Sequence, residues 1–335
     1  MNKFVFTCGD INGIGPEIVQ KALNKIYHAS ERAKFYFLCP AEVFERVSEK
    51  IPPSFAYRIT DKPSGEDRAS QEQFVEVIDI KEEGLRILPG SPTALSGLVS
   101  YRAIKESFEM ASSGKADAII TAPISKEALG MAGIDFPGHT EMYARWSGLK
   151  DFVMMFISPK MKCALVTIHE PLRKVSKLIT VNRIQNTLRV VVSSLRRDFN
   201  LENPKVAVLG LNPHAGEKGR IGKEETDVIL PALRTSGFNE FLAGPFVPDA
   251  FFARKLYKDY DIVIGMYHDQ VLIPFKMLNF SSGVNFTAGL PVVRTSPDHG
   301  TAFDIAWKFV ADEGSIMEAF NLSKKIVQSR KRRNA

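Results

Sequence analysis

The chain has 335 residues, of which 44% are hydrophobic and 24% are charged. This length is typical of two packed domains or one large α/β unit, and the composition excludes general disorder and a small disulfide scaffold. The formal net charge of +6 comes entirely from residues 321–335, because the preceding residues carry equal numbers of acidic and basic side chains. We interpret this basic end as a solvated, frayed terminus and expect no nucleic-acid partner.

The cysteines indicate a reducing compartment. Cys8, Cys39 and Cys163 form no C-x-x-C pair, and their odd number cannot close a disulfide framework. We expect them to be small buried hydrophobic residues. The N-terminus reaches Gly9 and Asp10 before a signal-peptide core can form, and no apolar run approaches the ~20 residues that a membrane helix needs. The sequence therefore predicts a cytoplasmic protein with no membrane anchor.

Short apolar runs alternate with helical patterns along the chain, which is typical of βαβ units and a largely parallel sheet. The runs lack strict alternation, as expected of strands that are covered on both faces. The clearest predicted strands are Phe4–Thr7, Phe35–Cys39, Ala118–Thr121, Ala164–Ile168, Val206–Leu211 and Asp261–Met266.

Helices are predicted where apolar residues recur at helical spacing. One begins near Pro16, another covers about Gly97–Ala111, and a third covers Val181–Phe199. Residues 52–88 differ, because they contain several prolines and the alternating stretch FVEVIDI. We expect loops and an antiparallel excursion there.

A glycine-rich turn, GDINGIGPEI, follows the first predicted strand and opens the first helix. Its backbone N–H groups suit a phosphate, but a tight strand-to-helix turn explains the glycines equally well. The stretch is neither G-x-G-x-x-G nor a P-loop.

Three histidines follow predicted buried strands: His169, His214 and His268. The carboxyl ends of parallel strands face one crevice, so three imidazoles could converge there on one ion such as Zn²⁺ or Co²⁺. The alternative is that each is a hydrogen-bonded loop histidine. Glu217 and Asp269 lie close to two of them in sequence and suit ligand orientation or proton transfer, although acids also cap loops.

A cationic group of residues predicts an anionic small substrate. Lys276 and Arg294 can bind phosphate or carboxylate, and His139 with Thr140 lies in the stretch GHTE. For each cation alone, a surface charge or a structural ion pair is an equally good interpretation.

Seven ordered motifs then carry a family resemblance. They are GDINGIGPEI, TAPISKEAL, PGHTEMYA, LNPHAGE, VPDAFF, YHDQVLIPFK and VNFTAGLPVVRTSPDHGTAFDIA. Together they span residues 9–306 and resemble the 4-hydroxythreonine-4-phosphate dehydrogenase family of vitamin B6 biosynthesis.

The resemblance implies an isocitrate/isopropylmalate dehydrogenase-like fold: two α/β/α domains with largely parallel sheets and the active site in the cleft between them. We expect residues 1–128 with 300–335 to form the cofactor-side domain. Residues 129–299 are expected to form the metal- and substrate-binding domain, which also forms a homodimer with a shared active site.

The implied reaction is the NAD(P)-dependent oxidation and decarboxylation of 4-phosphooxy-L-threonine to 3-amino-2-oxopropyl phosphate. One divalent ion, Zn²⁺, Mg²⁺ or Co²⁺, would act as a Lewis acid. A paralogue acting on 4-phosphorylated threonate or erythronate is the main alternative, and a metal-dependent phosphohydrolase is another.

Site residues follow from the same motifs. The resemblance assigns His169, His214 and His268 to the metal, and His139, Thr140, Lys276, Asn285 and Arg294 to the substrate. It places NAD at His299, Gly300, Thr301 and Ala302. Asp249 and Asp269 are both candidates for the catalytic base, and the sequence does not choose between them.

The chain departs from the family pattern at several positions. The family usually has Pro-Ala at Ile11 and Asn12, Gly at Lys218, Thr at Ala250, Gly at Val271, and smaller residues at Pro297 and Trp307. None of these departures removes an assigned ligand, but they can alter the shape of the substrate or cofactor pocket.

Overall fold

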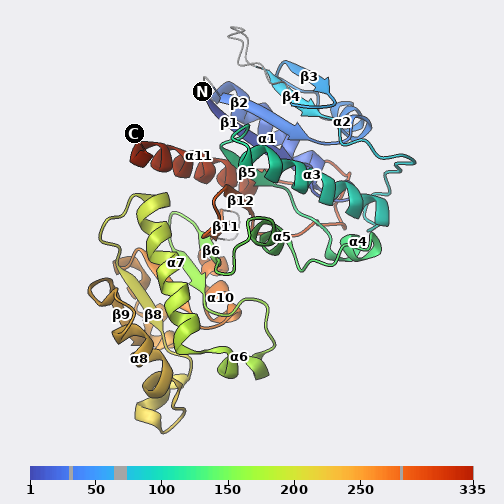
Figure 1. Cartoon of the computed structure of the whole chain (residues 1–335). Helices are drawn as coiled ribbons and strands as arrows, with labels where there is room; N and C mark the ends of the chain where they lie inside the picture. Colours follow the sequence, from blue (N-terminus) through green and yellow to red (C-terminus); the bar gives the residue numbers. More distant parts are fainter. Residues whose placement is uncertain (30–32, 64–73, 280–281, 335) are drawn as a thin grey trace. The chain divides into compact units, whose positions relative to one another are not determined.

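The computed structural model describes residues 1–29, 33–63, 74–279 and 282–334, and its chain divides into two compact units (Figure 1). Unit 1 contains Met1–Gly148 and Pro291–Val327, and unit 2 contains Leu149–Leu290 and Gln328–Ala335. Unit 1 therefore includes residues 129–148 and 291–299, which the sequence analysis assigned to the other domain. The functional division of the chain into cofactor and metal domains stays a prediction.

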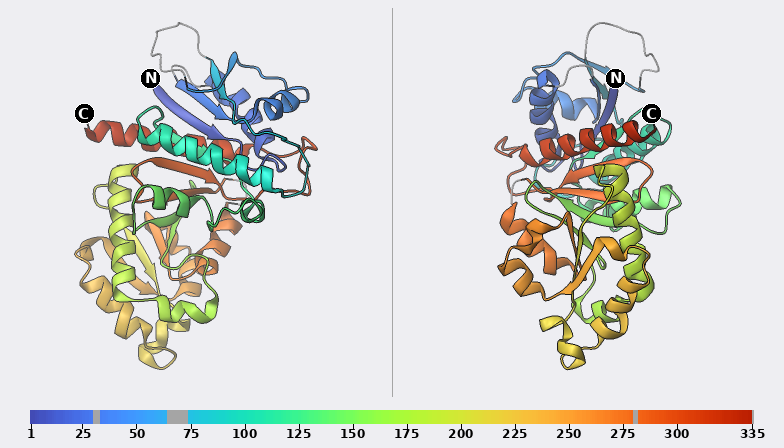
Figure 2. Two further views of the ribbon diagram at one scale, coloured as in Figure 1. Left: turned by 45° about the vertical axis from the view of Figure 1, so that its right-hand side comes forward. Right: turned by 90° about the vertical axis from the view of Figure 1, so that its left-hand side faces the viewer.

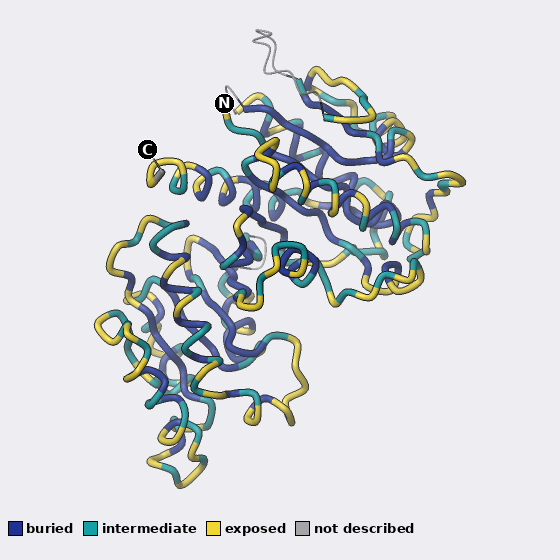
Figure 3. The backbone as a smooth tube through the Cα atoms, in the orientation of Figure 1, coloured by how far each residue is buried: buried dark blue, intermediate teal, exposed yellow. Residues whose placement is uncertain are grey.

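Unit 1 is built on a parallel sheet with the strand order β3-β4-β2-β1-β5-β12. The strands are β1 (Asn2–Thr7), β2 (Ala33–Leu38), β3 (Tyr57–Thr60), β4 (Val75–Ile78), β5 (Ala118–Thr121) and β12 (Val293–Pro297). Apart from the outermost strand β3, they are almost wholly buried, which explains their continuous apolar runs (Figure 3).

Helices lie on both faces of this sheet (Figure 1). The helices of unit 1 are α1 (Gly15–Ala29), α2 (Ala41–Ser48), α3 (Ala94–Ser112), α4 (Lys126–Met131), α5 (His139–Trp146) and α11 (Gly314–Asn334), and α4 packs on α3. In Figure 1, α3 crosses in front of the strands and α1 lies behind them. Phe320 of α11 packs against Phe4 and Phe35 and so covers the centre of the sheet.

The antiparallel excursion predicted within residues 52–88 is wrong in the described part of that stretch. Strand β4 pairs in parallel with both β2 and β3. The alternating pattern misled because Glu76, which suggested a solvent-exposed face, is fully buried. Its carboxylate lies 3.4 Å from Lys34 Nζ and accepts a hydrogen bond from Thr60, so a buried strand tolerates it. Residues 64–73 of this prediction lie outside the described residues.

Unit 2 contains a mixed sheet with the strand order β11-β6-β7-β10-β8-β9. Strands β11 (Val284–Ala288), β6 (Val153–Ile157) and β7 (Lys162–Leu165) pair antiparallel. Strands β7, β10 (Ile262–Gly265), β8 (Val206–Leu209) and β9 (Leu242–Phe246) pair in parallel. The carboxyl ends of β7, β10 and β8 therefore lie at the same edge of the sheet.

Helices lie on both faces of the unit 2 sheet as well. Figure 2 shows α7 (Val181–Phe199) on one side and α10 (His268–Leu278) on the other. The remaining helical segments are α6 (Leu172–Leu178), η1 (Pro213–Gly219), η2 (Glu225–Ile229), α8 (Leu230–Arg234), η3 (Asn239–Phe241), α9 (Pro248–Ala253) and η4 (Leu256–Asp259).

All the strands predicted from the sequence are present. The largest shift concerns the strand predicted over Ala164–Ile168, which the structure places over Lys162–Leu165. The helix predicted over Val181–Phe199 has those bounds. The three cysteines are free and buried, as predicted. No helix in the described ranges is long and apolar enough to cross a membrane.

The basic end is not frayed, which corrects the sequence-based interpretation. Helix α11 continues to Asn334, and Arg330 within it is largely buried. Its Nε atom donates to Asp198 Oδ1 at 2.7 Å, and Arg197 donates to the same carboxylate at 2.8 Å. Burial raises the pKa of Asp198, but the two guanidinium groups outweigh this effect and lower it overall. The cations at this end of the chain therefore include a structural pair that sequence spacing did not reveal.

Candidate active site

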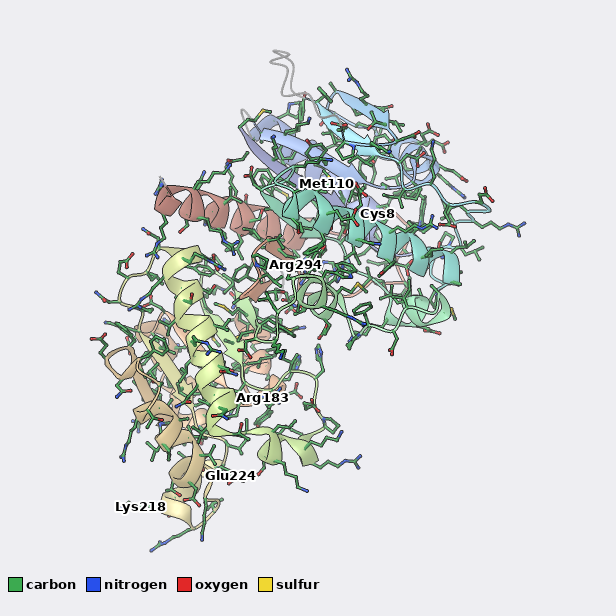
Figure 4. All side chains as sticks on the ribbon, in the orientation of Figure 1. Cys8, Met110, Arg183, Lys218, Glu224 and Arg294 are labelled. Atoms are coloured by element: carbon green, nitrogen blue, oxygen red, sulfur yellow. The ribbon has the colours of Figure 1, made fainter. Side chains whose placement is uncertain are left out.

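A buried guanidinium marks the candidate anion site of unit 1. Arg294 lies in β12 beside β5 and is 2% exposed. Its Nε and Nη2 atoms donate to Thr121 Oγ1 at 3.1 and 2.7 Å, and Thr121 is itself fully buried at the end of β5. Burial lowers the pKa of Arg294 to about 10, so the group still carries its charge at neutral pH. Figure 4 labels Arg294 among the strands of unit 1.

His139, the first residue of α5, adds a neutral imidazole to this cation. Burial lowers the pKa of His139 well below its usual value, and the charge of Arg294 lowers it further. The His139 Nε2 atom is enclosed and has no hydrogen-bond partner among the described residues. An unsatisfied buried polar atom costs about 1–3 kcal/mol, so a hydrogen-bonding ligand would relieve a real penalty. Thr140, the next residue, is buried at 3% exposure.

Tyr143, one turn further along α5, closes the same cluster. Its hydroxyl lies 2.8 Å from Ser107 Oγ of α3, and burial raises the pKa of Tyr143 to about 12. The phenol therefore stays neutral at physiological pH. A charged guanidinium and neutral hydrogen-bonding groups together suit an anionic substrate group such as phosphate or carboxylate.

The glycine-rich turn uses its backbone N–H groups internally, so the structure supports the tight-turn interpretation. The N–H groups of Asp10, Gly13 and Ile14 donate to the carbonyls of Pro123, Asp10 and Thr301. The Asn12 N–H donates to Asp10 Oδ1. A Cβ atom at Gly9, where φ is +67°, would lie 2.2 Å from the Pro123 carbonyl oxygen, so only glycine fits there.

The candidate NAD loop packs on this turn. Besides the Thr301 carbonyl, Trp307 contacts the turn, because its Nε1 atom donates to the Ile11 carbonyl at 2.9 Å. Asn12 is fully buried and donates to the Ser91 carbonyl at 2.8 Å. Ile11, Asn12 and Trp307, which all depart from the expected family pattern, thus take part in hydrogen bonds at the glycine-rich turn that follows β1. His299 and Gly300 remain exposed beside it.

Asp10 lies buried in the same turn. Burial raises its pKa to about 6, although hydrogen bonds from Asn12 and Ser96 favour the charged form. The pKa of Asp10 therefore lies close to physiological pH because the fold of the turn buries its carboxyl group.

In unit 2, two of the three strand-end histidines lie together. His169 follows β7 and His268 follows β10, and their ring centroids are 5.6 Å apart. His268 Nδ1 lies 2.6 Å from Asp269 Oδ1, so the carboxylate fixes the orientation of the imidazole. With Nδ1 bonded to a carboxylate, Nε2 is the ring atom of His268 that suits a metal ion, the usual arrangement of a metal-binding histidine.

His214 lies in an unusual left-handed turn after β8. Residues 214–218 have φ values of 53°, 49°, 76°, 43° and 57°, and only Gly216 among them is a glycine. A left-handed conformation costs about 1–2 kcal/mol for each residue with a side chain. Lys218, where the resemblance leads us to expect glycine, is one of these positions, so a residue with a side chain adopts a backbone conformation that favours glycine there.

Within the residues that the structure describes, no three His, Cys, Asp or Glu side chains are placed to hold one metal ion. One copy of the chain brings His169 and His268 together but does not add His214 to them. Since the resemblance expects residues from both subunits in each site, the three-histidine set stays a prediction.

The remaining predicted residues lie in unit 2. Lys276 is exposed on α10, and Asn285 in β11 has an enclosed Oδ1 atom without a partner in the described ranges. Asp249 is exposed in the first turn of α9. Asp269 is bonded to His268, so of the two acids it is the one with a visible structural role.

Sequence reasoning missed Thr121, Tyr143 and Glu225. Thr121 lies in the quoted stretch TAPISKEAL at the end of a predicted strand, and that position was a usable signal. Tyr143 lies four residues after His139, so helical spacing places it on the same face. Glu225 carried no signal, because its contacts depend on the conformation of the left-handed turn.

Comparisons with known proteins bear on the whole chain. Residues 31–323 match the family model "Pyridoxal phosphate biosynthetic protein PdxA". The chain is 38% identical to 4-hydroxythreonine-4-phosphate dehydrogenase of Prosthecochloris aestuarii, with 98% of each chain covered. It is also 37% identical to D-threonate 4-phosphate dehydrogenase of Pectobacterium atrosepticum, covering 96% of this chain and 99% of that one.

Solved structures agree with these matches. The 4-hydroxythreonine-4-phosphate dehydrogenase of Klebsiella pneumoniae superposes with a TM-score of 0.85 at 37% identity, covering 98% of this chain and all of that one. An isocitrate dehydrogenase from Methylococcus capsulatus shares the fold at 12% identity, with a TM-score of 0.53 over 99% of this chain and 87% of that one. The predicted family resemblance and α/β dehydrogenase fold are confirmed.

Proposed function

This chain belongs to the PdxA family of pyridoxal phosphate biosynthetic proteins, and from that premise we propose that it is a 4-hydroxythreonine-4-phosphate dehydrogenase. Its substrate, 4-phosphooxy-L-threonine, loses a hydride from the carbon that bears the hydroxyl group to NAD⁺ or NADP⁺, and the hydroxyl proton passes to a base. The resulting β-keto acid then loses CO₂ and takes up a proton, which gives 3-amino-2-oxopropyl phosphate.

The observation that carries this proposal is the pair of histidine rings, 5.6 Å apart, at the carboxyl edge of the parallel strands β7 and β10. Imidazole donors suit a divalent ion such as Zn²⁺ or Co²⁺, and Asp269 holds His268 in the orientation that a ligand requires. Such an ion, when bound, supplies Lewis-acid stabilisation of negative charge on the substrate oxygen. His214 completes the proposed ligand set.

The chain's own groups bind and orient the substrate in this proposal. Arg294 supplies a fixed positive charge, and the neutral His139 supplies a hydrogen-bonding nitrogen. Both side chains are buried, and Arg294 is held by two hydrogen bonds to Thr121, which lowers the entropic cost of orienting an anionic group. Thr140, Lys276 and Asn285 are proposed to contribute the remaining contacts. Asp269 fits the role of a positioning carboxylate, which leaves Asp249 as the candidate base.

The nicotinamide cofactor is proposed to bind with its adenosine end at residues 299–302. This loop is exposed at His299 and Gly300 and is fixed to the glycine-rich turn through Thr301 and Trp307. A fixed loop at the carboxyl end of a parallel strand is where ligands of open α/β sheets bind.

A homodimer with a shared site is proposed from the surface of α10. Ile273 and Met277, one helical turn apart on the helix that begins at His268, are 57% and 82% exposed. A second copy that covers this apolar face would bring its own residues close to the His169–His268 pair. Met277→Glu should therefore shift the protein from dimer to monomer in light-scattering chromatography and lower turnover, whereas an unchanged dimer would rule out this face.

A second candidate function is favoured by the D-threonate 4-phosphate dehydrogenase relative, whose identity to the chain is almost the same as that of the first relative. That substrate carries a hydroxyl group where 4-phosphothreonine carries an ammonium group.

One assay separates the two functions. The purified protein is incubated with Zn²⁺, Mg²⁺ or Co²⁺ and NAD⁺, and NADH absorbance is followed with each substrate. NADH formation with 4-phosphothreonine supports the first function, and formation with only the sugar-acid phosphates supports the second. Phosphate release without NAD⁺ would support a phosphohydrolase instead. His214→Ala should reduce turnover far more than thermal stability, and unchanged turnover would contradict the metal assignment.

A further inference from the structure

We propose that Glu225 is a positioning residue, whose buried carboxylate holds the left-handed turn over residues 214–218 in place and thereby presents the His214 imidazole to a divalent metal ion. The inference rests on the proposed function, in which His214 is a metal ligand. It adds a residue that touches neither the metal nor the substrate.

The first step is the set of bonds that Glu225 makes. It is 2% exposed and begins the π-helical segment η2. Its Oε1 atom accepts hydrogen bonds from the backbone N–H groups of Leu211 and Asn212, both at 2.7 Å. Its Oε2 atom accepts one from Asn212 Nδ2 at 2.9 Å. One carboxylate thus binds the two residues that connect β8 to the turn.

The second step is direct contact with the turn itself. A Cβ atom built on Gly216 would lie 2.5 Å from Glu225 Oε2. The carboxylate is therefore packed against the middle of the left-handed turn, at the one position in residues 214–218 that lacks a side chain. The same contact that requires glycine at residue 216 fixes the turn from one side.

The third step is that the start of the turn is already anchored. The Gly210 N–H group donates to the Phe246 carbonyl at 2.8 Å, and the Gly210 carbonyl accepts a hydrogen bond from Gln270 Nε2 at 2.7 Å. Because the chain is fixed up to Asn212, the backbone of Pro213 and His214 decides where the His214 ring lies, and the following residues of the turn hold that backbone from the other side. Segments of unfavourable backbone geometry persist only where their surroundings hold them, and Glu225 is the side chain in position to do so.

Glu224 offers a matched control. It is the adjacent carboxylate, and it binds Asn212 Nδ2 at 2.8 Å and Ser176 Oγ at 2.5 Å. It shares the Asn212 side chain with Glu225, but neither of these two bonds involves the backbone N–H groups of Leu211 and Asn212 that Glu225 holds. A change at Glu224 therefore removes a similar charge nearby without releasing residues 214–218.

Lys218 offers an independent probe of the turn. Figure 4 labels it beside Glu224 at the end of unit 2, and its side chain is exposed. Its φ of +57° favours glycine and disfavours β-branched residues. Substitutions at this exposed position change how readily residue 218 adopts the left-handed conformation, with little effect on the packing of the core.

The experiment measures Zn²⁺ affinity of the full chain after metal removal, by competition with a chromophoric chelator, and records thermal melting in parallel. Glu225→Gln should weaken Zn²⁺ binding by about 10- to 100-fold, the range for changes next to a metal ligand. Glu224→Gln should stay within about 3-fold. Adding Lys218→Gly to Glu225→Gln should restore at least about 3-fold, since glycine favours the left-handed conformation.

Two results would overturn the positioning role. One is a Glu225→Gln protein that melts lower but binds Zn²⁺ as the unchanged protein does. The other is equal Zn²⁺ affinity for Lys218→Gly and Lys218→Val, which would show that the conformation of the turn does not affect metal binding. This second comparison remains informative even if Glu225→Gln does not fold. His214→Ala separates this failure from failure of the proposed function: if it too binds Zn²⁺ normally, the metal assignment itself is wrong.

Discussion

Replacing Thr121 tests whether the buried guanidinium of Arg294 depends on a single hydroxyl oxygen. Thr121→Val is nearly isosteric, so it keeps the packing at the end of β5 but removes the acceptor of both hydrogen bonds from Arg294. Thr121→Ser keeps the hydroxyl and removes one methyl group. The two variants therefore separate hydrogen bonding from packing at the same site.

The magnitudes favour hydrogen bonding. A hydrogen bond to a charged group contributes about 1.5–3 kcal/mol, and a buried donor left unpaired costs about 1–3 kcal/mol. Because both bonds share one oxygen, we expect Thr121→Val to lower the free energy of unfolding of unit 1 by about 2–4 kcal/mol. Loss of one buried methyl in Thr121→Ser costs about 1 kcal/mol.

Urea denaturation followed by tryptophan fluorescence suits this comparison, because both tryptophans of the chain, Trp146 and Trp307, belong to unit 1. We expect the order of stability to be Thr121, then Thr121→Ser, then Thr121→Val. If the valine variant is as stable as the serine variant, packing dominates and the reasoning about Arg294 is wrong. The Michaelis constant for the phosphorylated substrate should also rise more in the valine variant, because its guanidinium is less firmly held.

Two further predictions concern buried carboxylates. Asp10 has a folded pKa of about 6, above the value of about 4 in an unfolded chain, so the native protein loses stability as pH rises between these values. Asp10→Asn should therefore match the unchanged protein near pH 4 and exceed its free energy of unfolding by about 2–3 kcal/mol above pH 7, and a pH-independent difference in urea titrations would contradict this. The pKa of Asp198 is lowered, so its contribution is present above about pH 4 and is lost as pH falls through the folded pKa. At pH 7 Asp198→Asn should cost about 3–5 kcal/mol, whereas Glu202→Gln, which removes an exposed partner of Arg333, should cost less than about 1 kcal/mol; equal losses in the same titrations would refute the structural role of the Arg330 pair.

The sequence predicted those parts of the fold that depend on local pattern. Val181–Phe199 has an unbroken helical stripe of apolar residues, and the structure reproduces its bounds. Strand β4 shows where local pattern fails, because the buried Glu76 is satisfied by Lys34 and Thr60 from neighbouring strands. A polar residue in a strand can be buried when a residue from a neighbouring strand pairs with it, and sequence spacing alone does not reveal that partner.

The sequence also predicted only the part of the candidate site that follows from local pattern. Parallel strands bring their carboxyl ends to one edge, so the strand-end positions of His169 and His268 predict that they lie close together, and their rings do. Sequence patterns do not predict the conformation of residues 214–218, because left-handed backbone is rare for residues with side chains. The Asp198–Arg330 pair joins residues 132 positions apart, so the role of the basic end was also beyond local reasoning.

The strand-end histidines are supported by different local structures, and this difference explains why one of them needs a remote carboxylate. His268 is the first residue of a regular helix, and its neighbour Asp269 sets the orientation of its ring. His214 instead lies in a left-handed backbone conformation that residues with side chains disfavour. Gln270 links the two segments, because its side chain accepts from Met266 N–H and donates to the Gly210 carbonyl. The hydrogen bonds of Gln270 and Glu225 together fix the carboxyl ends of β10 and β8 relative to each other. Buried polar side chains behind the histidines therefore set the positions of the segments that carry His214 and His268.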